Sequence, residues 1–193
     1  RSESMRASTK RHPSDIRLTV GCDETGRISG FVFDGIFNTG AYASWGPTVA
    51  NRVPIHASGP YVTKDYRANS VAVHTNAPPA GAFRGFGVPQ SAVAQECAFD
   101  LLAEKLGMDR MAFRRLNALK NGVPTVTGQV FNSGVGIDDC FAALEDSWHT
   151  AVASAASFNQ TAISDDSPWR KGVGIASCWY GCGNTSLPNP STM

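Results

Sequence analysis

The stretch from residue 81 to residue 90, GAFRGFGVPQ, constrains the fold more than any other part of the sequence. Three glycines, two phenylalanines and one arginine occupy its first seven residues, and a helical pattern begins at Pro89. Glycine allows tight turns and close approach of the backbone to another group, and a helix start offers unpaired N–H groups to an anion or an oxo group. These residues leave two interpretations open, a tight turn around a buried phenylalanine or a loop that contacts a ligand.

Alternating apolar residues before this stretch predict a β-hairpin. Its arms are residues 16–22 and 28–38, and its turn is the sequence Asp-Glu-Thr-Gly at residues 23–26. Because the second arm is apolar on both faces towards its end, we expect it to be a central strand that is covered on each side. Further strands are predicted at residues 70–75 and 172–180.

The helical periodicity lies mainly after the glycine-rich stretch. Residues 38–60 are predicted to be an ordered loop with a short helical turn near Val49. The chain therefore belongs to the α+β class, with a mixed or antiparallel β-sheet and helices packed on one side. The predicted helices cover residues 89–106, residues 110–120 with Asp109 as the N-cap, and residues 138–154.

Composition limits the classes of function. A net charge of +1 with 17% charged residues argues against nucleic acid as a partner. No apolar run approaches the roughly 20 residues that span a bilayer, so we expect no membrane segment and a cytoplasmic protein. Five scattered cysteines argue against a disulfide framework and favour buried thiols. The four histidines lie far from one another and from plausible acidic partners in the sequence. We therefore predict no metal site and no catalytic triad that uses them.

Several side chains could form part of a ligand site. Phe83, Phe86 and Tyr180 supply flat apolar surface for an aromatic heterocycle. Arg52 and Arg84 could polarise a carbonyl or stabilise negative charge, although a structural salt bridge is the simpler expectation for Arg52. The sequence shows no nucleophile beside a base and no cluster of metal ligands. The chain is therefore expected to supply only part of a ligand site.

The helix predicted at residues 110–120 contains two adjacent arginines, Arg114 and Arg115. They could bind a phosphate, but the positions of Leu116 and Leu119 on the inner side favour an exposed, solvated face for both arginines.

Residues 81–96, GAFRGFGVPQSAVAQE, resemble the molybdenum-binding subunit of the molybdenum hydroxylases, the xanthine dehydrogenase and aldehyde oxidase family. The resemblance extends over essentially the entire chain. It implies a single segment of a molybdopterin-binding domain, with a sheet and loop region at 1–80, the glycine loop and helices at 81–158, and a strand and loop at 168–193. Its other matching stretches are residues 10–13 (KRHP), 38–42 (NTGAY), 102–109, 115–117 and 181–185.

The resemblance implies oxidative hydroxylation of a purine-like N-heterocycle or an aldehyde, with water as the oxygen source. The implied cofactor is molybdenum held by molybdopterin, either as such or as the cytosine dinucleotide. The [2Fe–2S] clusters and FAD are expected on other domains or subunits, which would be partners of this chain together with the remaining molybdenum-binding segments.

The family's cofactor contacts fall on the glycine loop. By resemblance, Arg84 lies against the molybdenum, and Phe83 and Gly85 belong to the same cofactor-binding loop.

The substrate side is implied by three other residues. Phe86 matches the phenyl group that packs on the substrate ring, and Arg52 matches the arginine that orients substrate, which replaces the salt-bridge expectation. Thr185 matches a substrate-side threonine. Asn184 stands where purine-oxidising members often have phenylalanine, so a purine, a nicotinate-like ring and an aldehyde all stay open as substrates.

Two catalytic parts of the family have no counterpart in the sequence. The general-base glutamate would lie beyond Met193, and a glutamine-bearing cofactor loop would lie before Arg1. We therefore expect a piece of a longer chain that is inactive alone and forms one wall of the site. A non-catalytic assembly domain is the alternative. A mononucleotide-binding domain is weaker, because no phosphate-loop motif is present.

Overall fold

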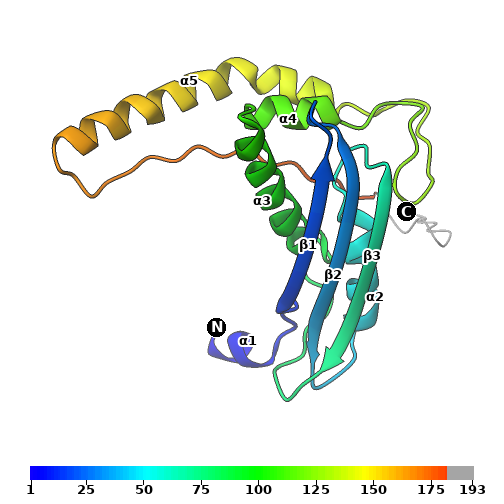
Figure 1. Cartoon of the computed structure of the whole chain (residues 1–193). Coiled ribbons are helices and arrows are strands. Elements are labelled where there is room, and N and C mark those ends of the chain that lie inside the picture. Colours follow the sequence, from blue (N-terminus) through cyan, green and yellow to red (C-terminus); the bar gives the residue numbers. More distant parts are fainter. Residues whose placement is uncertain (182–193) are drawn as a thin grey trace, which may run out of the picture.

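The computed structural model, which describes residues 1–181, has a small sheet that carries helices on one face and a long helical arm at one end (Figure 1). Its elements in chain order are α1 (Ser2–Ala7), β1 (Ser14–Cys22), β2 (Ile28–Gly40), α2 (Gly46–His56), β3 (Asp65–His74), α3 (Val88–Leu106), α4 (Arg110–Asn117) and α5 (Ile137–Ser164).

The sheet is mixed and has the strand order β1-β2-β3. The predicted hairpin is confirmed, because β1 and β2 pair antiparallel, from Ser14 opposite Phe37 to Cys22 opposite Ile28. β3 pairs parallel to β2, because the chain crosses back through α2 before it enters the sheet again. β2 is thus the central strand, as expected, and the mixed α+β class is confirmed.

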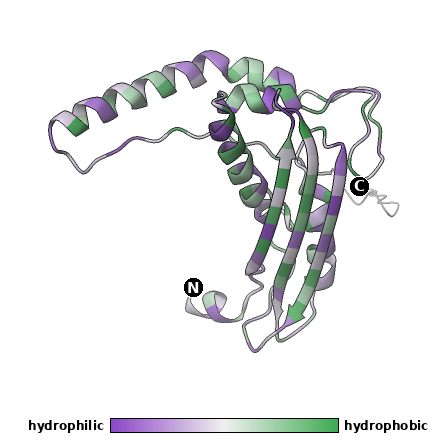
Figure 2. Cartoon of the chain, viewed as in Figure 1, coloured by the Kyte–Doolittle hydropathy of each residue, from purple (hydrophilic) through white to green (hydrophobic). Residues whose placement is uncertain are grey.

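The sheet is covered on one face only within the described residues. Phe31, Phe33 and Phe37 of β2 are buried beneath α2 and α3, whereas Ile36 on the other face is 50% exposed. The strands accordingly alternate between hydrophobic and hydrophilic residues (Figure 2). The expectation that β2 is covered on both faces was wrong for this part of the chain, because both helices pack on the same side.

The region predicted as a loop with one helical turn contains the complete helix α2. Val49, Ala50 and Val53 are buried at a helical spacing. Two prolines concealed this helix in the sequence. Pro47 lies in the first turn, where a missing N–H costs nothing, and Pro54 lies in the last turn.

The helices after the glycine loop follow the prediction at their starts. Gly107 ends α3 in the left-handed conformation at φ 64°, and the Asp109 side chain accepts a hydrogen bond from the Ala112 N–H at 2.9 Å. α4 ends at Asn117, three residues before the predicted end. There the chain turns to pair with residues 60–62, and the Val62 N–H donates to the Asn117 carbonyl at 2.8 Å.

The expectation that Arg114 faces solvent was wrong. Its side chain is 0% exposed and forms ion pairs with Glu96 at 2.6 Å and Asp100 at 2.8 Å. Arg115 is the outward residue and pairs with two acids of α5. The two arginines are adjacent in the sequence. The packing of α4 against α3 buries Arg114 and leaves Arg115 partly exposed.

The C-terminal third differs most from prediction. α5 continues to Ser164, well beyond the predicted end, and residues 172–180 run as extended chain that pairs with no strand in the described structure. This chain returns beside α5 (Figure 1), where the Asn159 side chain exchanges two hydrogen bonds with the Lys171 backbone at 2.8 and 2.9 Å. Val173 and Ile175 pack against the core. The alternating apolar residues of 172–180 therefore pack against the core and do not pair in the sheet.

The cysteines correct a further expectation. Cys97, Cys140 and Cys178 are exposed and Cys22 is half-buried, so these thiols are not core residues. All four of these thiols are free in the described structure.

Candidate functional site

The glycine loop has an unusual backbone. Gly85, Phe86 and Gly87 all have positive φ angles, of 88°, 42° and 103°. Turn hydrogen bonds close the loop from the Phe86 N–H to the Phe83 carbonyl at 2.8 Å and from the Val88 N–H to the Gly85 carbonyl at 2.9 Å. A phenylalanine in this region costs about 1–3 kcal/mol and persists only where its surroundings hold it. The residues around the loop therefore hold Phe86 in a strained backbone conformation.

The loop requires glycine for space as well as conformation. A Cβ atom at Gly85 would lie 2.7 Å from the Pro89 ring, and one at Gly87 would lie 2.8 Å from Cγ2 of Val53 and 3.1 Å from the Val49 carbonyl. Gly87 thus allows the start of α3 to lie directly against α2.

This close approach brings Arg52 next to the loop. The Arg52 guanidinium carbon lies 5.8 Å from the centre of the Phe86 ring, and Trp45, just before α2, meets the same ring edge-on at 6.1 Å. Within residues 1–181 Arg52 forms no ion pair, so the salt-bridge hypothesis finds no support there. Trp45, which is 57% exposed, was missed in the sequence because nothing placed it beside Phe86.

Phe83 and Arg84 form the outer side of the loop. Phe83 is 47% exposed, and the Arg84 side chain is exposed and has no hydrogen-bond partner among the described residues. The backbone N–H groups of Arg84, Gly85 and Gly87 also have no partner in that part of the chain. These donors fit an anionic or oxo group, which is the chemistry that a molybdenum-pterin group would present.

A second aromatic group lies at the end of α2. The buried His56 ring stacks on Tyr180 at 5.5 Å and meets Trp179 edge-on at 6.0 Å. Nδ1 of His56 lies 3.1 Å from the Arg52 carbonyl, and burial lowers the pKa of His56. The structure therefore places Tyr180, one of the predicted flat surfaces, on His56, which lies one helical turn after Arg52 on α2. Thr185 and Asn184 lie outside the described residues.

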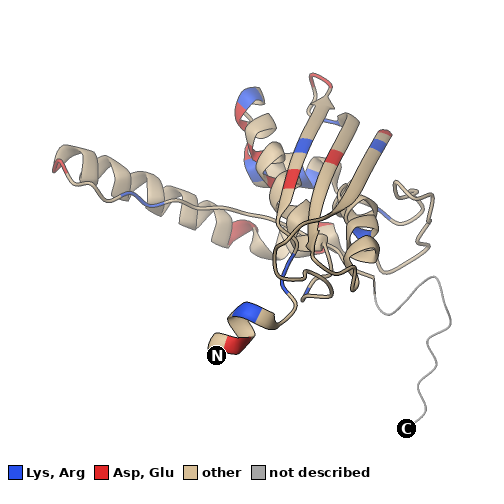
Figure 3. Cartoon of the chain, turned by 90° about the horizontal axis from the view of Figure 1, so that it is seen from below, with Lys and Arg blue, Asp and Glu red and all other residues tan. Residues whose placement is uncertain are grey.

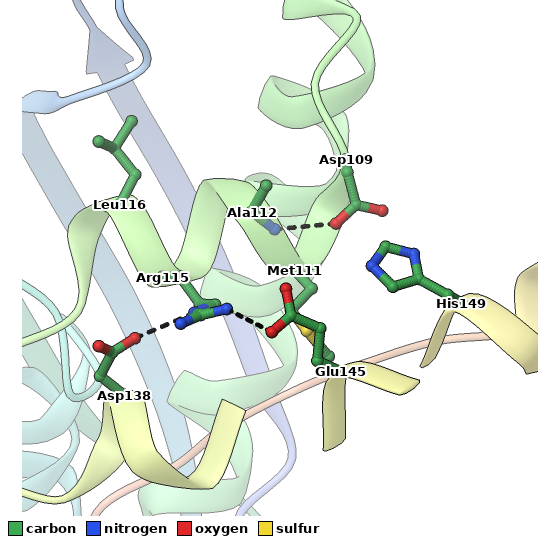
Figure 4. Close-up of a pocket in the computed structure, with 8 residues that line it drawn as sticks. All are labelled: Asp109, Met111, Ala112, Arg115, Leu116, Asp138, Glu145 and His149. Atoms are coloured by element: carbon green, nitrogen blue, oxygen red, sulfur yellow. Dashed lines mark hydrogen bonds and ion pairs between the residues drawn. The ribbon is translucent and has the colours of Figure 1, made fainter. Parts of the chain in front are cut away.

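The described structure also contains a cavity that involves none of the predicted site residues. It has a volume of about 480 Å³ and lies between α4 and α5, where Arg115 bridges Asp138 at 3.0 Å and Glu145 at 2.9 Å (Figure 4). The Trp148 ring N–H donates to Asp109 nearby, at 2.8 Å. These ion pairs and this hydrogen bond join the start of α5 to α4.

Charged residues and potential metal ligands are scattered over the described structure. Residues of both signs are dispersed over the elements (Figure 3), and the described residues contain no group of three or more potential metal-ligating His, Cys, Asp or Glu side chains. Within residues 1–181, none of the helices combines the length and the apolar character that crossing a bilayer requires.

The described residues form an α+β domain in which one strained loop offers donors and aromatic rings. Residues 1–118 match the molybdopterin cofactor-binding domain family. The chain belongs to this family, and its relatives and structural neighbours are molybdenum hydroxylases, as the sequence motifs indicated.

Individual relatives show the extent of the likeness. The chain is 44% identical over 137 residues to the nicotinate dehydrogenase large molybdopterin subunit of Eubacterium barkeri. The aligned region covers 71% of this chain and 32% of that protein. It is 32% identical over 186 residues to the xanthine dehydrogenase molybdenum-binding subunit of Escherichia coli O157:H7, covering 96% and 24%. The solved aldehyde oxidoreductase of Desulfovibrio gigas superimposes with a TM-score of 0.74 at 30% identity, covering 77% and 16%. The chain thus spans a third or less of each of these proteins.

Proposed function

We propose that the chain forms one wall of the cofactor and substrate site of a molybdenum-dependent hydroxylase that oxidises an N-heterocycle or an aldehyde with oxygen from water. The observation that carries the proposal is the strained glycine loop, which has an exposed Arg84 side chain and backbone N–H groups without partners among the described residues, and which holds Phe86 beside Arg52. The molybdenum-pterin group would supply the redox chemistry when bound. Iron–sulfur and flavin groups would belong to other domains or subunits.

Each named side chain has a distinct task in this proposal. Arg84, with Phe83 and Gly85, holds the cofactor through positive charge and backbone donors. Phe86 offers a ring against which a flat substrate can pack, and Arg52 neutralises charge on the substrate. Trp45 meets the Phe86 ring edge-on and supports it. Thr185 is proposed, from the resemblance alone, to lie on the substrate side.

The cofactor assignment is tested by Arg84→Ala in the complete assembled enzyme. We expect kcat/KM to fall by about 10²-fold, the effect typical of losing one donor to developing charge, or the molybdenum content per enzyme to fall sharply. Arg67→Ala, on the face of β3 that is exposed among the described residues, is the matched control and should leave both quantities unchanged. Wild-type turnover and wild-type molybdenum content in Arg84→Ala would contradict the assignment.

The substrate class is tested at Arg52. For a heterocycle that carries a carboxylate or acquires negative charge, Arg52→Met should raise KM or lower kcat by about 10–150-fold, as expected for a lost charge-assisted hydrogen bond. For an aldehyde the change should be below about 3-fold, since no such bond is lost. Arg52→Lys retains the charge and separates loss of charge from loss of the guanidinium fork. Equal effects of Arg52→Met on both substrate classes would refute a substrate-charge role.

The alternative is a non-catalytic assembly domain of such a complex. It predicts that the complex carries neither molybdenum nor pterin through this chain, which metal analysis and pterin fluorescence after oxidation measure. We further propose that the 193-residue chain alone is inactive, and measurable substrate oxidation by the isolated chain would refute this.

A further inference from the structure

The segment before β1 lies along the glycine loop. The Lys10 N–H donates to the Pro79 carbonyl at 3.1 Å, and the Gly81 N–H donates to the Lys10 carbonyl at the same distance. Lys10 and Ala80 thereby form an isolated parallel bridge. Residues far apart in the sequence are thus fixed side by side, and the next residue, Arg11, faces the loop.

Arg11 contacts the loop at three points. One guanidinium nitrogen donates to the Arg84 carbonyl at 2.5 Å, the other donates to Oε1 of Gln90 at 3.3 Å, and the guanidinium lies 4.9 Å from the centre of the Phe83 ring. Gln90 is itself buried and lies within 3.5 Å of the His12 carbonyl. Arg11 therefore joins the outer side of the loop to the first turn of α3.

We infer that Arg11 is a positioning residue that holds the glycine loop in its strained conformation and so fixes Phe83 and Arg84. The turn from Gly85 to Gly87 contains two glycines, whose backbone is the least restricted of all residues, and a phenylalanine in an unfavourable region. Such a turn needs restraint from outside. The planar fork of arginine can restrain two acceptors at fixed positions while its face covers a ring, which a lysine cannot do.

This role rests on the proposed function only for its catalytic consequence, so two measurements separate the two claims. The first is hydrogen exchange of the assembled enzyme with Arg11→Gln. Peptides that cover residues 81–90 should exchange at least 10-fold faster, whereas peptides from residues 96–117 should be unchanged. Arg6→Gln, a matched arginine on α1 that has no ion pair or side-chain hydrogen bond among the described residues, should exchange as the wild type does. Unchanged exchange at 81–90, or faster exchange throughout the domain, overturns the inference.

The second measurement is steady-state kinetics with the same variants. Arg11→Gln should lower kcat at least 10-fold, because the loop that carries Arg84 and Phe86 would lose its placement. Arg11→Lys should recover only part of kcat, since one ammonium group cannot serve both acceptors and the ring. If exchange at 81–90 rises while kcat stays at the wild-type value, the role in positioning for catalysis is refuted although the restraint of the loop stands. If the enzyme proves to contain no molybdenum, the exchange result still decides whether Arg11 restrains the loop.

Discussion

Replacing Arg114 by methionine is expected to lower the free energy of unfolding by about 3–5 kcal/mol, the range typical of removing one partner from a buried ion pair. Arg114 is 0% exposed, and its Nε donates to Oε2 of Glu96 at 2.6 Å. It also pairs with Asp100 at 2.8 Å. Methionine would fill most of the space, but it would leave the buried Glu96 carboxylate without a compensating charge.

The loss of stability extends beyond one ion pair because the Glu96 carboxylate also accepts a hydrogen bond from another residue. Its Oε1 accepts a hydrogen bond from the Tyr61 hydroxyl at 2.9 Å, and that hydroxyl lies 2.5 Å from the Ser177 hydroxyl. Burial is the largest single influence on the pKa of Arg114 and lowers it, but the charge and hydrogen bond of Glu96, together with Tyr61 and Asp100, raise that pKa above its ordinary value. Burial and the same charge raise the pKa of Tyr61. The network therefore stays charged at Arg114 and neutral at Tyr61, and it fixes the returning C-terminal chain to the core.

Urea unfolding of the purified chain, followed by circular dichroism, measures this loss. Arg115→Met is the matched control, because Arg115 is the next residue on the same helix and its ion pairs with Asp138 and Glu145 are solvent-accessible. Its effect should be small and should diminish further in high salt. Equal destabilisation by the two substitutions would contradict the structural distinction between these arginines.

Replacing Gly87 by alanine should destabilise the protein by about 2–5 kcal/mol, the sum of a left-handed backbone cost and a steric overlap. The backbone of Gly87 has φ 103°, and a Cβ atom would lie 2.8 Å from Cγ2 of Val53. Because Val53 and the Val49 carbonyl belong to α2, relief of the overlap would move the loop away from Arg52. The assembled enzyme should then also lose bound molybdenum.

Gly107→Ala provides the control for this substitution. Gly107 also has a positive φ, of 64°, but no atom lies within 4 Å of an added Cβ. Its destabilisation should be limited to the conformational cost of about 1 kcal/mol, and its molybdenum content should match the wild type. Full molybdenum retention in Gly87→Ala at normal protein stability would show that contact between the loop and α2 is dispensable for the cofactor.

Local signals in the sequence determined most of the element types. The hairpin at residues 14–40 follows from alternation and a polar turn, and α3 and α4 follow from periodicity, Gly107 and the Asp109 cap. These signals act within a few residues, so they survive in the sequence alone. The glycine-rich stretch left a tight turn and a ligand-contacting loop open, and its resemblance to the molybdenum hydroxylases predicted the family.

Tertiary structure alone decided which residues meet. The burial of Arg114, the exposure of Arg115, the pairing of Phe86 with Arg52 and Trp45, and the contacts of Arg11 all depend on elements distant in the chain. The extended run at 172–180 has the alternation of a strand, yet it packs on the core without joining the sheet. The sequence by itself thus determined the hairpin, the starts of the helices after the glycine-rich stretch and the family. The environment of each arginine was decided only by packing, because charge, hydrogen bonding and burial depend on neighbours that no local pattern specifies.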